Sequence, residues 1–174
     1  MVGRVTGERA EGVGPGLGPH ADQPYSSVAS KTPLWTCPKC GQRFVGRNMW
    51  HSCARHAIAE HFAGKDPSVR QLFRAYRALV RSLGPVRVYA QKTRIIFQTR
   101  ARFTGVIVRR QWLDVHIWLK RRLDDRRFRR IEFLPKHDYI HSLRLRSERQ
   151  LDGWLKQVLR EARRVGNQQG STVE

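Results

Sequence analysis

The pattern of apolar and polar positions predicts one long amphipathic helix near the middle of the chain. Asp66 and Pro67 suit a helix start, and Gly84 suits its end. Between them, apolar residues recur at helical spacing: Val69, Leu72, Phe73, Tyr76, Val80 and Leu83. Four arginines follow another face, which we expect to be solvated: Arg70, Arg74, Arg77 and Arg81.

After Gly84 the periodicity changes to the alternation that is typical of strands. We expect six strands, at Pro85–Ala90, Thr93–Thr99, Arg102–Val108, Gln111–Leu119, Phe128–Leu134 and Tyr139–Leu145. The fourth is partly apolar on both faces, which predicts a central strand. A capping-box pattern from Ser147 to Gln150 then leads into a second amphipathic helix. The order predicts an α+β fold, with helices on one face of a mainly antiparallel β-meander.

Length and composition set the domain organisation. The chain has 174 residues, of which 40% are hydrophobic, enough for one domain and a small appendage. We expect a disordered tail at 1–34, a cysteine-bearing module at 35–56, the α+β domain at 57–165 and a second tail at 166–174. Neither a membrane span nor a signal peptide is recognisable, so we expect a cytoplasmic protein without a membrane role.

Residues 35–56 carry all three cysteines, Cys37, Cys40 and Cys53. The run Cys37-Pro-Lys-Cys40-Gly is typical of a metal knuckle, in which two thiolates three residues apart reach one ion. Zinc prefers four ligands, so a histidine must complete the set. His51 and His56 are the local candidates, and spacing alone slightly favours His56. Because a Cys₃His site is closed, we expect the zinc to be structural.

An ordered set of motifs, from a Cys37-Pro-x-Cys40-Gly head to Tyr89-x-Gln-Lys-Thr-Arg-Ile95, resembles an uncharacterised bacterial family. The motifs between them are Asn48-x-x-His51-Ser-Cys53, His61-Phe-x-Gly-Lys65 and Leu83-Gly-Pro-Val86. The family is a domain of unknown function that is sometimes labelled a predicted transport protein, here preceded by a zinc-ribbon-like head. The resemblance implies that His51, rather than His56, is the fourth ligand. It implies no activity.

Charge points to a polyanionic partner. The formal net charge is +20, and residues 100–149 alone hold fifteen basic and six acidic residues. Strand alternation would align Arg127 with Arg129, and Arg144 with Arg146, on one face of the sheet, with Trp112, Trp118 and Tyr139 interleaved. Basic groups follow phosphates and aromatic rings stack on bases, so we expect a low-specificity binder of DNA or RNA. Two arginines of the cysteine module, Arg43 and Arg47, would add phosphate contacts.

A second hypothesis is a module that binds a small anion or a protein partner. Tyr89, Lys92 and Arg94 cluster at the junction of the first two strands, and such side chains suit a phosphate or carboxylate. Motifs of P-loop, nucleophile-elbow or zinc-protease enzymes are missing from the sequence. We therefore expect a binding protein rather than an enzyme.

Overall fold

The structure is a computed structural model that describes residues 32–47, 49, 51–135 and 138–169. Of the tails predicted at 1–34 and 166–174, residues 32–34 and 166–169 are described, and residue 166 still belongs to the C-terminal helix. The rest of both tails lies outside the described residues. Within the described ranges, no helix combines the length and the apolar character needed to cross a bilayer.

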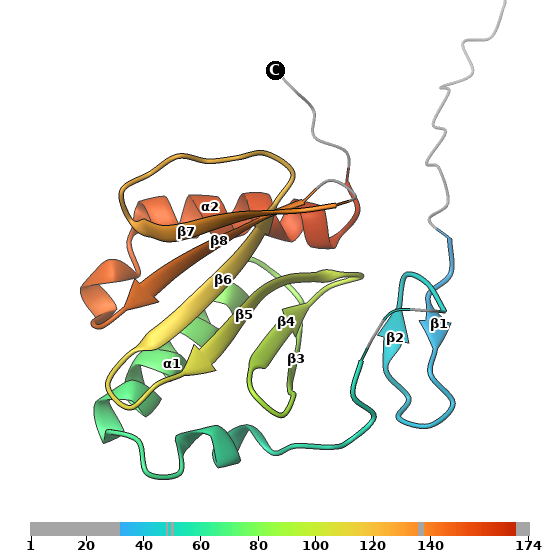
Figure 1. The fold of residues 1–174 in the computed structure, drawn as a ribbon, viewed down its shortest axis with the longest axis horizontal. Coiled ribbons are helices and arrows are strands. Elements are labelled where there is room, and N and C mark those ends of the chain that lie inside the picture. The colour runs from blue at the N-terminus through green and yellow to red at the C-terminus, as the bar shows by residue number, and fades with distance from the viewer. Residues whose placement is uncertain (1–31, 48, 50, 136–137, 170–174) are drawn as a thin grey trace, which may run out of the picture. The chain divides into compact units, whose positions relative to one another are not determined.

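The predicted α+β architecture is confirmed by a six-stranded antiparallel sheet and two helices (Figure 1). The strands are β3 (Arg87–Ala90), β4 (Ile95–Gln98), β5 (Arg102–Val108), β6 (Leu113–Leu119), β7 (Phe128–Leu134) and β8 (Asp138–Leu145). The helices are α1 (Pro67–Arg81), preceded by the 3-10 helix η1 (Ile58–Phe62), and the C-terminal α2 (Gly153–Gly166). All six predicted strands are present, and β6 is central as expected.

The sheet departs from a simple meander at its last two strands. The spatial order is β3-β4-β5-β6-β8-β7, so β8 pairs with β6 and leaves β7 at the edge. The reason lies in their side chains: β8 carries the fully buried His141 and Leu145, whereas no residue of β7 is buried. A charged strand is stable at an edge, where one side faces water. His141 also fixes the connection before β7, because its Nε2 accepts a hydrogen bond of 2.9 Å from the backbone N–H of Leu123.

The two helices begin at aspartate caps. The Asp66 side chain accepts a hydrogen bond from the backbone N–H of Ser68, as the sequence predicts for α1. The second helix begins later than predicted. The capping box from Ser147 to Gln150 instead forms the N-terminus of a short 3-10 helix, η2 (Glu148–Gln150). Asp152 then caps α2 by accepting from the backbone N–H of Leu155. The predicted capping box is therefore present, but it belongs to η2 and not to α2.

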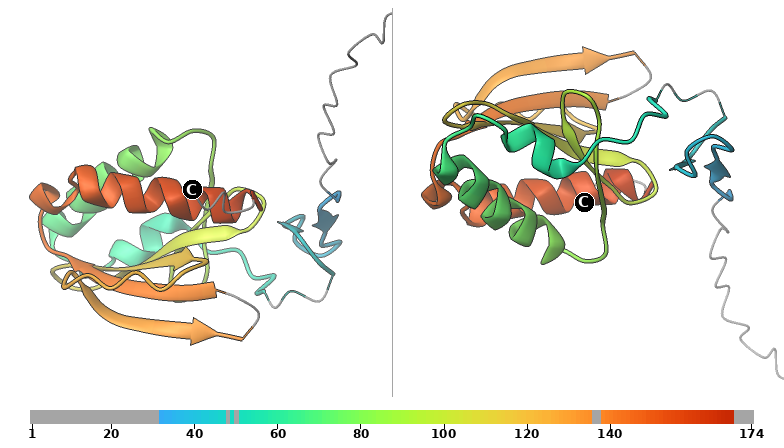
Figure 2. Two further views of the ribbon diagram at one scale, coloured as in Figure 1. Left: turned by 90° about the horizontal axis from the view of Figure 1, so that it is seen from above. Right: turned by 90° about the horizontal axis from the view of Figure 1, so that it is seen from below.

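Both helices cover the same face of the sheet, and the side chains between the helices and that face form the core (Figure 2). Paired residues on neighbouring strands point to one side, so Val106 and Val115 face the helices together. The buried residues of α1 are those that its periodicity predicts, from Val69 to Val80. One polar bridge crosses this core: the hydroxyl oxygens of Tyr76 and Thr104 lie 2.6 Å apart, and the Thr104 hydroxyl donates to the His116 carbonyl oxygen.

We expect Tyr76→Phe to lower the free energy of unfolding by about 1–2 kcal/mol, because Thr104 loses a buried hydrogen-bond donor while the packing is retained. Urea unfolding followed by circular dichroism measures the change. Tyr139→Phe is the control, since no hydrogen bond joins its hydroxyl to a described residue, and it should leave stability within about 0.5 kcal/mol. Equal effects of the two variants would contradict a special role for the Tyr76–Thr104 bridge.

Candidate metal centre and the helix-free sheet face

The cysteine module is built on a short hairpin. Strand β1 (Trp35–Thr36) pairs with β2 (Arg43–Phe44), and the connection between them holds Cys37 and Cys40. The turn is closed by a hydrogen bond from the Gly41 N–H to the Cys37 carbonyl oxygen, 2.9 Å long. Gly41 has a φ of 68°, a left-handed conformation that favours glycine. The Cys-Pro-x-Cys-Gly run therefore forms the tight knuckle that its residue types predict.

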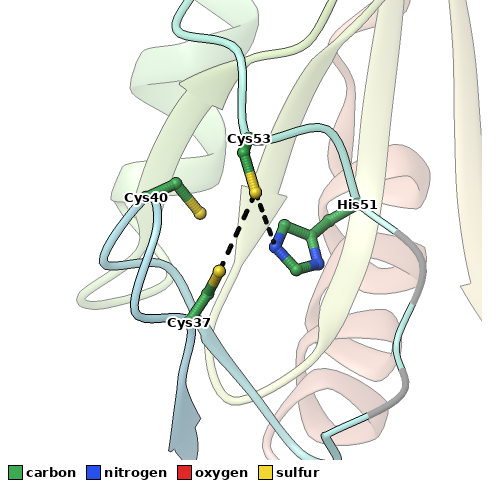
Figure 3. Close-up of side chains that lie close together, drawn as sticks. All are labelled: Cys37, Cys40, His51 and Cys53. Carbon is green, nitrogen blue, oxygen red and sulfur yellow. Dashed lines mark hydrogen bonds between the residues drawn. The ribbon is translucent and has the colours of Figure 1, made fainter.

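The fold brings Cys37, Cys40, His51 and Cys53 together, with their ligand atoms all within 4.8 Å of one another (Figure 3). Two thiolates bound tetrahedrally to zinc at about 2.3 Å lie about 3.8 Å apart. The Sγ atoms of Cys37 and Cys53 are 3.8 Å apart, and the Cys53 Sγ is 3.5 Å from the His51 Nε2. All three thiols are free rather than joined in a disulfide. The group can hold a metal ion.

The electrostatics of the cluster favour one thiolate in advance of metal binding. Burial alone would raise the pKa of Cys37, but the backbone N–H groups of Cys40 and Lys39 and the His51 ring donate to its sulfur. Together with the Cys40 thiol they lower this pKa to about 6. Burial and the neighbouring thiols raise the pKa of Cys53 to about 11. A cation placed among the three sulfurs would offset this crowding of negative charge.

The ring of His51 is held in a ligand-like orientation. Its Nδ1 lies 2.8 Å from the Met49 carbonyl oxygen, which leaves Nε2 directed at the cysteines. The ring also packs on Phe44, with centroids 4.3 Å apart. His56, the other sequence candidate, lies outside the cluster: it forms an isolated bridge with Ala90, and its Nδ1 is 3.6 Å from a Glu60 carboxylate oxygen.

The second notable region is the face of the sheet opposite α1 and α2, which we call the helix-free face. The register places Gly105, His116, Ser142 and Arg130 in one row across it. Trp118 lies on the same face, half-buried, with its ring beside Gly105. By register and alternation, the cations of this face include Arg87, Arg94, Arg102, Arg130, Arg144 and Arg146, together with Arg109, which ion-pairs with Asp114. Among the side chains that the structure describes, its acids are Asp114 and Glu132.

A compact network orders one end of this face. The guanidinium groups of Arg144 and Arg146 lie over the Trp112 ring, 4.2 and 4.9 Å from its centroid. Asp114 accepts from Trp112 Nε1 at 3.0 Å and from Arg109 and Arg144 at 2.8 and 3.3 Å. Burial alone would raise the pKa of Asp114, but these two arginines lower it below its usual value, so the carboxylate stays charged. The sequence-predicted neighbours Arg144 and Arg146 are thus brought together.

The other predicted arginines lie elsewhere. Arg127 precedes β7, ion-pairs with Asp125 and Asp152, and places its guanidinium 3.4 Å from the Trp154 ring centroid. A register shift between Phe128 and Arg130 leaves Arg129 in a bulge, so it does not align with Arg127 as alternation alone predicts.

Within the cysteine module, the side chains of Arg43 and Arg47 are exposed, as a phosphate contact would require. The Arg43 carbonyl oxygen accepts a hydrogen bond of 2.8 Å from Gln98 Nε2. No pattern in the sequence predicts this bond between the module and β4. Gln98 is a polar residue at the end of an apolar strand, and the structure leaves it only 3% exposed.

The three side chains predicted to bind a small anion have separate surroundings. The Tyr89 hydroxyl donates to Gln98 Oε1 at 2.9 Å. Arg94 belongs to the helix-free face, where its charge contributes, after burial, to a lowered pKa of His116. Lys92 instead lines a hollow with residues of the η1 region.

Comparison with known families adds one finding. Residues 58–164 match the family described as "Domain of unknown function (DUF5655)". The chain belongs to this family. Its match covers the helices and the sheet and leaves out the cysteine module, so the metal cluster is an addition to the DUF5655 domain in this chain. No curated protein and no solved structure matches the chain.

We expect His51→Asn to lower the apparent metal affinity roughly a hundredfold. A structural zinc site of four ligands binds with roughly 10–16 kcal/mol, and the loss of one ligand removes about a quarter of that free energy. His56→Asn is the matched control and should keep full metal content. Metal analysis of protein purified without chelator, followed by competition with a chromophoric chelator, measures both. A loss of metal from the His56 variant instead would place the fourth ligand at His56.

Proposed function

We propose that this chain is a low-specificity binder of single-stranded nucleic acid, with a structural zinc ion in the cysteine module. The strand would lie along the helix-free face. The observation that carries the proposal is the combination on that face of an excess of arginines over acids, among the described side chains, with the half-buried rings of Trp112 and Trp118. Guanidinium groups bind phosphates and indole rings stack on bases, which together suit an unpaired strand better than a duplex.

Zinc suits the cluster better than other common ions because three thiolates and one imidazole are soft and borderline ligands in a tetrahedral spacing. The four ligands fill that geometry and leave no position for a substrate. The module also has few apolar residues to stabilise it: among described residues 32–57, only Cys37 and Phe44 belong to the buried hydrophobic set. Metal binding would supply the folding energy that such a core cannot.

Arginines also occur outside the helix-free face. A test of the site must therefore distinguish the effect of an arginine's position from the effect of the total net charge. Arg74 and Arg81 lie exposed on α1, on the opposite side of the core. Removing them changes the net charge as much as removing Arg130 and Arg146 from the helix-free face. The two double variants are therefore matched in charge; they differ in position and in that Arg130 ion-pairs with Glu132 and Arg146 lies over Trp112.

We expect the double variant Arg130→Gln/Arg146→Gln to weaken binding of a labelled single strand at least about tenfold. The slope of log affinity against log salt should also fall by about 1.4, because two phosphate contacts are lost. Fluorescence anisotropy across a salt series, with zinc-loaded protein free of nucleic acid, measures both quantities. The double variant Arg74→Gln/Arg81→Gln should change the affinity less than about twofold.

Equal losses in the two double variants would contradict a defined binding face and reduce the interaction to net charge. Trp118→Leu separates stacking from charge, because it removes the ring and keeps every cation. It should lower affinity roughly tenfold while leaving the salt slope unchanged. A wild-type protein that binds no strand even at low salt would overturn the proposal.

A further inference from the structure

A hollow of about 220 Å³ lies between the residues around η1 and the turn that joins β3 to β4. Its lining is Glu60, His61, Ala63, Lys65, Lys92, Thr93 and Val108. Sites for drug-sized ligands measure about 300–1,000 Å³, so this hollow suits a smaller group. None of the helix-free face's arginines lines it, so the hollow is separate from the proposed nucleic-acid surface.

Both walls of the hollow are held by backbone hydrogen bonds. The Gln91 N–H donates to the Arg94 carbonyl oxygen at 2.8 Å, which closes the turn and presents Lys92 and Thr93 at its tip. On the other wall, the Lys65 N–H donates to the Phe62 carbonyl oxygen at 3.2 Å. Gly64, with a φ of 64°, supplies the left-handed turn just before Lys65. The cationic side chains therefore project from defined turns.

The charge in the hollow is positive. Lys65 is half-buried and Lys92 exposed, and neither ammonium forms an ion pair with a described residue. The one carboxylate of the lining, Glu60, has two partners: its Oε1 accepts from the Ala57 N–H at 3.1 Å, and its Oε2 lies 3.6 Å from His56 Nδ1. Two ammonium groups thus face a small space that holds no uncommitted acid, which is the arrangement an anion requires.

The lining also narrows the class of anion. Burial is the largest influence on the His61 ring and lowers its pKa, whereas the charge of Glu60 acts in the opposite direction. At neutral pH a phosphate monoester carries about 1.5 to 2 negative charges on three terminal oxygens. These oxygens can accept from both ammonium groups and from the Thr93 hydroxyl, whereas a carboxylate has one charge and two oxygens.

We propose that His61, Lys65, Lys92 and Thr93 form a binding site for the phosphate group of a phosphate monoester. Such a group occurs both on small metabolites and at the end of a nucleic-acid strand. The site differs in kind from a surface that follows internal phosphodiesters, because a diester has one charge and two terminal oxygens and its chain continues in both directions, which a hollow of about 220 Å³ does not accommodate.

The test uses the full chain loaded with zinc. Inorganic phosphate and glycerol 3-phosphate are titrated while ¹H–¹⁵N spectra are recorded. We expect saturable shifts at the amides of Lys65, Lys92 and Thr93. Each of Lys65→Met and Lys92→Met should weaken binding about tenfold, whereas Lys156→Met in α2, which removes the same charge elsewhere, should change it less than twofold. Acetate, which has one charge and two oxygens, should bind more weakly than phosphate.

Two oligonucleotides of one sequence, with a 5′-phosphate and with a 5′-hydroxyl, distinguish the source of the group. A stronger affinity for the phosphorylated strand that disappears in Lys65→Met would assign the site to strand ends. Equal affinities, with glycerol 3-phosphate still bound, would assign it to small esters. Shifts spread over the arginines of the chain, or lysine variants that match Lys156→Met while their melting temperatures stay unchanged, would overturn the site. Neither result depends on whether the helix-free face binds internal phosphates.

Discussion

Within the described part of the chain, two long helices cover the six-stranded sheet, and both lie on the same face. That constraint divides the molecule. One face becomes a core of aliphatic and aromatic side chains around the Tyr76–Thr104 bridge. The other must shield the middle of a sheet from water without a second layer. Here guanidinium and indole groups take that role: Arg144 and Arg146 lie over Trp112, and Gly105 lets the Trp118 ring lie close to the backbone. The chemistry that shields this face also suits a polyanion.

A shortage of buried apolar residues also gives the Cys/His cluster its importance. The hairpin of β1 and β2 is two residue pairs long, and it contributes only Phe44 and Cys37 to the buried hydrophobic set among the described residues. A two-stranded hairpin is marginally stable at best in water. Four ligands drawn from the knuckle and from residues 51–53 close a loop that hydrogen bonding alone would leave weakly held. The module lies outside the DUF5655 match, which begins at residue 58, and a hydrogen bond from Gln98 to the Arg43 carbonyl oxygen joins it to the domain.

Sequence periodicity recovers what depends on local alternation and misses what depends on pairing. The buried face of α1 and the six strands follow from spacing alone, because each strand alternates independently of its partners. The exchange of β7 and β8 could not be predicted in this way, since it depends on which of the two strands would expose less apolar surface to water at the edge of the sheet. The bulge at Arg129 has the same origin: one extra residue shifts every side chain after it to the other face.

The candidate sites show the same limit. The grouping of Cys37, Cys40 and Cys53 follows from short spacings, but spacing slightly favours His56, and only the fold places the ring of His51 beside the sulfurs. Lys65 and Lys92 stand 27 positions apart, and no local pattern joins them.

Charge balance sets a lower bound on the cations that remain available. The chain has 34 basic and 14 acidic residues, so at most 14 of the cations can pair one to one, which leaves 34 − 14 = 20. Several acids are committed to structural pairs away from the helix-free face, such as Glu161 with Arg121 and Asp152 with Arg127. An excess of this size destabilises a compact chain through self-repulsion, and a bound polyanion would relieve it. Cations gather on the helix-free face and in the hollow of Lys65 and Lys92. A bound anion would reduce the repulsion at either place, and the proposed occupants differ: the open face would suit an extended strand, and the small hollow a compact group.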